Sequence, residues 1–270
     1  MREVSFGQYY PANSFVHKCD PRAKLLFLVA YIVAVFMAQN FYALGVCTAV
    51  FVFVAAFSGV KFSSLLRSVK AITFLLVFTA VLNLFFHSGE KVLLSWGIIT
   101  ITEEAVYFTI FLAVRLFLLV LSSAILTLTT TPVALTDGIE SLLKPLKWIR
   151  FPVHELALIM SIALRFIPIL TDETGRIMNA QKARGADFET GGIIKRVKAV
   201  IPVLIPLLIS AFRRAEELGD AMDARCYSGS HVRTKFKKLT FSWRDLLAVI
   251  LLAALFTGII LLRIYTAAII

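Results

Sequence analysis

Apolar residues gather in five long runs along the chain, at residues 25–39, 41–57, 71–86, 105–128 and 246–262. A helix crosses the hydrocarbon layer of a membrane with about 20 mostly apolar residues, or with as few as about 17. Several of these runs are near that lower limit. We expect a tight turn at Gln39 and Asn40, which part the first run from the second. The pattern therefore predicts five membrane-spanning helices.

Between the fourth and fifth runs, the pattern changes to that of amphipathic helices. From Leu156 to Gln181, mostly apolar residues recur every three or four positions, the spacing that places side chains on one face of a helix. A second stripe of this kind extends from Leu208 to Cys226. Two long helices are therefore expected here, with most of their charged residues off the apolar stripes.

An alternative topology counts residues 153–170 and 197–210 as membrane spans too. The first of these segments carries Arg165, and an arginine at the bilayer centre costs about 2.5–3.5 kcal/mol on insertion scales. The second segment is short and is interrupted by Pro202 and Pro206. Long amphipathic helices at or below the membrane surface are preferred, and the alternative stays open.

Composition agrees with a membrane protein. Of the 270 residues, 59% are hydrophobic and only 17% are charged, whereas soluble domains are nearer half apolar and a quarter charged. The net charge of +11 would fit a nucleic-acid partner. In membrane proteins, however, its commoner cause is an excess of Lys and Arg in cytoplasmic loops, so no nucleic-acid partner is expected.

Charge also orients the chain, because basic loops lie on the cytoplasmic side of a membrane. Residues 129–244 hold 18 of the 28 Lys and Arg residues, so this block and the N-terminus are expected to be cytoplasmic. We expect a membrane domain with four spans at residues 1–128, a cytoplasmic or interfacial domain of long amphipathic helices at 129–244, and a last span within 245–270. The fold class is an all-α membrane protein.

A short motif occurs twice in the basic block. The sequence Ala-Gln-Lys-Ala-Arg-Gly at residues 180–185 is echoed by Ala-Met-Asp-Ala-Arg-Cys at residues 221–226. Arg184 continues an apolar stripe and Arg225 borders one. A cation at a helix C-terminus is favoured by the helix dipole, so each arginine could simply cap its own helix. Small residues around both let a partner approach, and a guanidinium pairs well with a carboxylate. We expect two docking contacts, onto acidic sites of a partner.

Signatures of catalysis or metal binding are missing from the chain. The sequence lacks the Gly-rich phosphate-binding loop of ATP-binding proteins. It also shows no nucleophile–base pair, and its cysteines and histidines are too scattered for a metal site. Arg115, inside the fourth run, is expected to make an internal hydrogen bond between spans or to contact a cytoplasmic loop.

Several short motifs together resemble one family. They are Asp-Pro-Arg-Ala-Lys at residues 20–24, Thr-Thr-Thr-Pro at 129–132, Leu-Arg-Phe-Ile-Pro at 164–168, and the two arginine motifs. In these the chain resembles the transmembrane T component (EcfT) of energy-coupling factor (ECF) transporters, which are ABC-type importers of vitamins and metals. The likeness covers most of the chain.

The resemblance implies a coupling role in a bacterial cell membrane. The T component would join two cytoplasmic ABC-type ATPase subunits to one substrate-binding membrane subunit, the S component, and the ATPases would bind the ATP, so no cofactor is expected in this chain. The residues implied to contact the ATPases are Ala183, Arg184, Gly185, Ala224, Arg225 and Cys226. Those implied to contact the S component are Phe166, Pro202, Pro206 and Phe212.

One position departs from the family pattern, because Cys226 stands where the family has glycine. The departure leaves open whether the second helix ends as sharply as the first, or whether Gly229 ends it instead.

Two other functions are considered. One is a membrane-bound enzyme acting on a phosphorylated or lipid-linked substrate, with Arg165, Arg184 and Arg225 binding phosphate. The other is a self-contained secondary transporter. Such transporters usually repeat their spans and place polar sites at the membrane midplane, whereas the clear repeat here lies in the basic block. The coupling subunit, which is not an enzyme, is the preferred interpretation.

Overall fold

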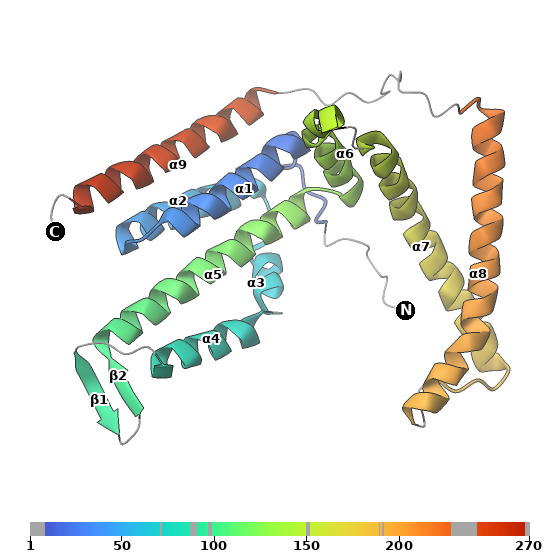
Figure 1. Cartoon of the computed structure of the whole chain (residues 1–270), viewed down its shortest axis with the longest axis horizontal. Helices are drawn as coiled ribbons and strands as arrows, with labels where there is room; N and C mark the ends of the chain where they lie inside the picture. Colours follow the sequence, from blue (N-terminus) through green and yellow to red (C-terminus); the bar gives the residue numbers. More distant parts are fainter. Residues whose placement is uncertain are drawn as a thin grey trace. The chain divides into compact units, whose positions relative to one another are not determined.

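The computed structural model describes residues 9–70, 72–86, 91–96, 99–149, 152–188, 190, 192–227 and 242–267. By their contacts these residues form two compact units. The first combines Met1–Val153 with Leu239–Ile270, and the second comprises His154–Lys238. Both units are coloured along the chain in Figure 1.

The first unit is a helical bundle with one hairpin (Figure 1). Its elements are α1 (Pro21–Met37), α2 (Phe41–Ser58), α3 (Phe62–Lys70), α4 (Thr73–Phe86), β1 (Val92–Trp96), β2 (Ile99–Thr102), α5 (Glu103–Thr129), α6 (Pro132–Leu142), a 3-10 helix (Lys144–Ile149) and α9 (Trp243–Ala267). The long apolar runs of the sequence fold into α1, α2, α4, α5 and α9. These helices confirm the predicted all-α membrane class.

Two apolar clusters hold the bundle together. In the first, α1, α2, α5 and α9 meet around the fully buried side chains of Tyr31, Val35 and Leu255. In the second, α3 packs on α5 through Leu65, Val69 and their neighbours. Inside a membrane such contacts stabilise the bundle through van der Waals packing, because lipid tails are as apolar as these side chains and supply no hydrophobic driving force. Both clusters draw on helices far apart in the sequence.

Arg115 of α5 is accommodated inside the bundle by internal contacts. One guanidinium nitrogen donates a hydrogen bond to the Ala38 carbonyl, which follows the last residue of α1. The guanidinium also lies over the Phe111 ring, 4.6 Å from its centroid, where a cation is attracted by the face of the ring. The expected internal hydrogen bond between spans is confirmed.

The antiparallel hairpin of β1 and β2 was not predicted from the sequence. It lies between the third and fourth apolar runs of the sequence. The alternation Ile-Thr-Ile-Thr at residues 99–102 is a strand signal, and Thr102 then starts α5, because its side chain accepts a hydrogen bond from the Ala105 amide. The hairpin therefore leads directly into the longest helix of this unit.

Among the described residues, length and apolarity identify four helices that could cross a membrane: α2, α5, α7 and α9. The pair α3 and α4 makes a fifth candidate if it is one span bent by 61°. With its 17 residues, α1 is at the lower length limit. Multiple spans are thus supported, and α7 has the length and composition of one even though the sequence favoured placing it at the membrane surface.

Two long helices make up the described regular structure of the second unit, α7 (Val153–Ala183, with Val153 at the unit boundary) and α8 (Ile193–Ala224). An ion pair joins them, with 3.2 Å between a guanidinium nitrogen of Arg214 and a carboxylate oxygen of Glu173. The helices continue through Pro168, Pro202 and Pro206. The two long helices predicted from the periodicity are therefore present, and each ends at an arginine motif.

Candidate functional site

The first arginine motif closes α7 with a Schellman motif. The Ala186 amide donates to the Gln181 carbonyl at 3.0 Å, and the Gly185 amide donates to the Lys182 carbonyl at 3.0 Å. These are the two hydrogen bonds that define the motif. Gly185 has a φ of 88°, a left-handed conformation that glycine adopts without strain because it lacks a Cβ. Arg184 is the residue between the last helical turn and this reversal.

The second motif closes α8 in the same way. The Tyr227 amide donates to the Met222 carbonyl at 3.0 Å, and the Cys226 amide donates to the Asp223 carbonyl at 2.9 Å. Cys226 has a φ of 56° and is the non-glycine residue with positive φ in the described part of the chain. The helix thus ends as sharply as the first one, with cysteine in the conformation that Gly185 holds. Gly229, the alternative stop, lies outside the described residues.

Both arginines are available to a partner. The two motifs are exposed at all six predicted contact positions, namely Ala183, Arg184, Gly185, Ala224, Arg225 and Cys226. Within the described residues, neither the Arg184 nor the Arg225 guanidinium has a hydrogen bond or ion pair to the protein. Their side chains therefore do not cap their own helices, and the donors of both guanidinium groups are free for external acceptors.

The four residues predicted to face another membrane subunit lie on these same helices. Phe166 is half-buried on α7, whereas Pro202, Pro206 and Phe212 are exposed on α8. Phe212 is 70% exposed, and eight further large apolar residues of α8 are also exposed, namely Ile194, Val197, Val200, Ile201, Leu204, Ile205, Leu208 and Ile209. A helix with so much exposed apolar surface is suited to a lipid or protein contact.

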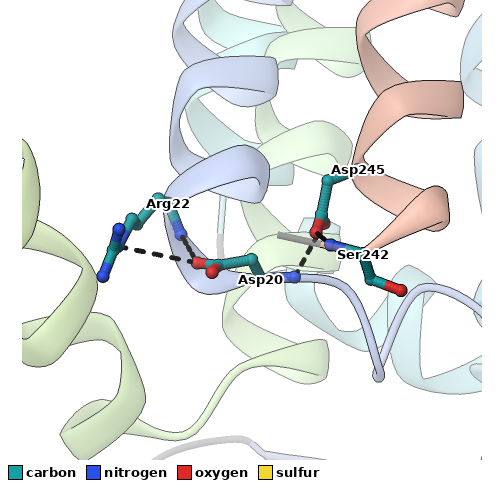
Figure 2. A network of polar contacts seen from close by, with 4 residues as sticks. All are labelled: Asp20, Arg22, Ser242 and Asp245. Carbon is teal, nitrogen blue, oxygen red and sulfur yellow. Dashed lines mark hydrogen bonds and ion pairs between the residues drawn. The ribbon is translucent and has the colours of Figure 1, made fainter. Parts of the chain in front are cut away.

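A polar joint that the sequence analysis missed connects the starts of α1 and α9 (Figure 2). The carboxylate of Asp245, which is 2% exposed, accepts hydrogen bonds from the Ser242 amide at 2.7 Å and from the Asp20 amide at 2.9 Å. Asp20 in turn caps α1, because its carboxylate accepts from the Arg22 amide at 2.9 Å. The signal for Asp245 was present as the capping-box spacing Ser-x-x-Asp at residues 242–245.

Lys24 brings two of the family-like motifs together. Its buried ammonium donates to the Thr129 carbonyl at 2.9 Å and to the Thr130 hydroxyl at 3.3 Å, and it also reaches the His17 carbonyl at 3.3 Å. These three contacts satisfy the ammonium where it is buried. The segment at residues 20–24 is thereby fixed to the end of α5.

The described residues contain no cluster of three or more His, Cys, Asp or Glu side chains that could hold a metal ion. The two sets of features that stand out are therefore the exposed arginine ends in the second unit and the buried polar joint in the first. One presents cations to the outside, and the other fixes the helices of the bundle.

Comparison with known proteins gives extensive matches. Residues 12–236 match the model of the CbiQ family, described as cobalt transport protein. An energy-coupling factor transporter transmembrane protein (EcfT) of Ruminiclostridium cellulolyticum is 46% identical over 263 residues, which is 97% of this chain and 98% of that protein. The protein of the same name from Brevibacillus brevis is 47% identical over 245 residues, 91% of this chain and 92% of the relative. Another, from Streptococcus thermophilus, is 43% identical over 261 residues, with 97% and 98% covered.

Proposed function

The chain belongs to the energy-coupling factor transporter transmembrane protein (EcfT) family, and we propose that it transmits the ATP-driven motion of two ATPase subunits to a substrate-binding S component. As a member of this family it is a transporter component in the membrane and not an enzyme.

The observation that carries the proposal is the equivalence of the two arginine ends. Arg184 and Arg225 each follow the last residue of a long helix, each precede a left-handed residue, and each leave their guanidinium exposed. Two equivalent ends fit two ATPase subunits. Small neighbours at Ala183 and Ala224 allow a close approach, and acidic side chains in the ATPases would meet each guanidinium with two parallel hydrogen bonds.

Long helices are suited to carry the motion. With 31 residues in α7 and 32 in α8, each is about 45 Å long at 1.5 Å per residue. When the ATPases move on binding or hydrolysing ATP, the arginine-tipped ends would move with them. The exposed apolar surface of α8 around Phe212 would pass this motion to the S component, together with Phe166, Pro202 and Pro206.

The chain has a defined orientation in the membrane, and the transporter carries a defined class of cargo. The N-terminus and residues 129–244 lie on the cytoplasmic side, where the ATPases and their ATP are, as the concentration of Lys and Arg in this block supports. The chain itself needs no cofactor. The cargo is a vitamin or a metal ion, in keeping with the description of the matching family as cobalt transport proteins, and the S component selects it.

Affinity purification of the tagged chain from the membrane of its own host tests the proposal. We expect two ABC-type ATPase subunits and a small apolar membrane protein to co-purify, and ATP hydrolysis to require the ATPases. A chain that purifies without ATPases, or that turns over a lipid-linked substrate unaided, would contradict it.

A further inference from the structure

A cavity of about 510 Å³ lies inside the first unit, between α1, α2, α5, α9 and residues 15–19, which precede α1. Its size falls in the range of about 300–1,000 Å³ that ligand pockets have. Most of its wall is apolar, with aromatic and aliphatic side chains from all four helices, among them Phe27, Tyr31, Phe53, Phe57, Leu251 and Ala254. Phe53 and Phe57 are each more than half exposed, so the cavity opens at the outer surface of the bundle.

Cations and polar groups occupy one end of this cavity. Its lining includes Lys24 in the first turn of α1, Thr129 at the end of α5 and Arg244 in the first turn of α9. Lys24 uses its ammonium on three oxygen atoms of the protein. The guanidinium of Arg244 has no hydrogen bond or ion pair to any described residue, so its donors are available to a ligand.

Two carboxylates near this end, Asp20 and Asp245, accept hydrogen bonds from backbone amides, and one Asp20 carboxylate oxygen has no hydrogen-bond partner among the described residues. Asp245 accepts hydrogen bonds from two backbone amides, and Asp20 accepts one from the Arg22 amide. Neither carboxylate lines the cavity. Among the described residues, the charged side chains that line the cavity itself are the cations Lys24 and Arg244, and this lining favours an anionic ligand at this end.

The depth of the cavity matches one leaflet of a bilayer. Along α9 the lining runs from Arg244 to Ala254, which is about 15 Å at 1.5 Å per residue. The hydrocarbon core of a membrane is about 30 Å thick, so one leaflet accounts for about 15 Å. The lining residues of α2 lie between Phe51 and Phe57 and those of α5 between Ser122 and Thr129, and both helices have the length and apolarity of membrane spans.

We propose that this cavity holds one acyl chain of an anionic glycerophospholipid, whose phosphate is bound by Arg244 beside Lys24. The cavity is apolar along the depth of one leaflet, opens to the outer surface of the bundle and carries cations at one end. In such a lipid an apolar acyl chain likewise leads to a negatively charged phosphate. Basic pockets between transmembrane helices are known to receive anionic headgroups.

Photolabelling of the full chain, in the complex with which it purifies, tests this assignment. The protein is placed in nanodiscs of phosphatidylcholine containing phosphatidylglycerol with a photoreactive diazirine in one acyl chain. We expect labelled peptides from residues 244–254 of α9 and from the facing turns of α2. Added phosphatidylglycerol should compete for this labelling, whereas added phosphatidylcholine and inorganic phosphate should not.

Two substitutions test the headgroup contact and the acyl-chain contact independently, and each has a matched control on the same helix. Arg244→Gln should lower the labelling about fivefold, the effect of removing one cation near an anionic lipid surface. Ala254→Phe should abolish it by filling the cavity. Arg263→Gln removes a cation near the other end of α9, and Ala253→Phe adds the same ring at an exposed position that does not line the cavity, so both should label like the wild type.

The outcomes decide the assignment. Competition by phosphatidylglycerol, together with loss in Arg244→Gln and Ala254→Phe variants that retain wild-type melting temperatures, supports it. Labelling that does not distinguish the two lipids, or that survives Ala254→Phe, overturns it. The proposal is also overturned if residues of the cavity crosslink to another segment of this chain or to a co-purifying membrane protein and the lipid is excluded. If Ala254→Phe lowers the melting temperature, lipid competition and Arg244→Gln decide alone.

Discussion

Replacing Gly185 by alanine changes the end of α7 without adding a steric clash. A Cβ at this position meets no other atom within 4 Å, so the effect comes from the backbone alone. An L-residue in the left-handed conformation costs about 1–2 kcal/mol. Alanine also lowers the conformational entropy of the unfolded chain, and this stabilises the folded state by about 0.4–1 kcal/mol. The helix end should therefore be weakened by about 1 kcal/mol.

The converse change is available at the second motif. Cys226 already adopts a φ of 56°, so Cys226→Gly should strengthen the end of α8 by about the same 1 kcal/mol, for the same reasons taken in reverse. A Cys226→Ser variant keeps a side chain of similar size and the same backbone preference. It should leave the helix end unchanged and thereby separates the backbone effect from any role of the thiol.

Hydrogen exchange measures both effects at single amides. The Ala186 amide donates to Gln181, and the Tyr227 amide donates to Met222, so each reports the closing bond of its helix. About 1 kcal/mol corresponds to a change of about fivefold in protection. Gly185→Ala should lower protection at Ala186, and Cys226→Gly should raise it at Tyr227. Shifts in the same direction, or protection unchanged in both variants, would refute the assignment of these two residues as equivalent caps.

The remaining predictions concern the bundle and are read as changes in the melting temperature of the detergent-solubilised chain. Lys24→Met should destabilise it by about 1–3 kcal/mol, because buried carbonyls lose their donor, whereas Lys61→Met, at an exposed lysine, should not. Equal melting temperatures of the wild type and Lys24→Met would contradict the burial of the charge. Asp245→Asn should cost about 1–3 kcal/mol, because an amide NH₂ then faces a backbone donor, and a wild-type melting temperature would argue against the joint. Gly138→Ala should cost about 1–3 kcal/mol by overpacking, because the new Cβ would lie 3.1 Å from the Pro21 side chain, and unchanged stability would contradict that close approach.

Much of the helical architecture follows from local patterns. Runs of apolar residues predict α2, α5 and α9, because only a helix satisfies all its backbone hydrogen bonds inside a membrane. The periodic stripes predict α7 and α8, and the placing of Gly185 directly after Arg184 predicts where the first of these ends. In each of these cases the information lies within a few helical turns.

Other features depend on residues that local patterns do not connect. The hydrogen bond between Asp20 and Asp245 joins residues 225 positions apart, and no spacing rule pairs them. The sequence pattern predicts that Lys24 is one of the cytoplasmic positive charges of the N-terminal segment. In the structure its side chain is buried against the end of α5. Cys226 stands where the family pattern has glycine. The backbone hydrogen bonds at the end of α8 nevertheless hold it in the left-handed conformation that Gly185 adopts.

The affinity of the chain for its ATPase subunits tests the coupling proposal most directly. In nanodiscs, Arg184→Ala and Arg225→Ala should each weaken binding by at least about thirtyfold, since truncating one partner of a buried charge pair costs about 2–5 kcal/mol, and the double variant should lose binding and uptake. Arg176→Ala in α7 and Arg213→Ala in α8, which remove exposed cations elsewhere on the same helices, should bind like the wild type. Wild-type affinity and uptake in the double variant would contradict the proposal.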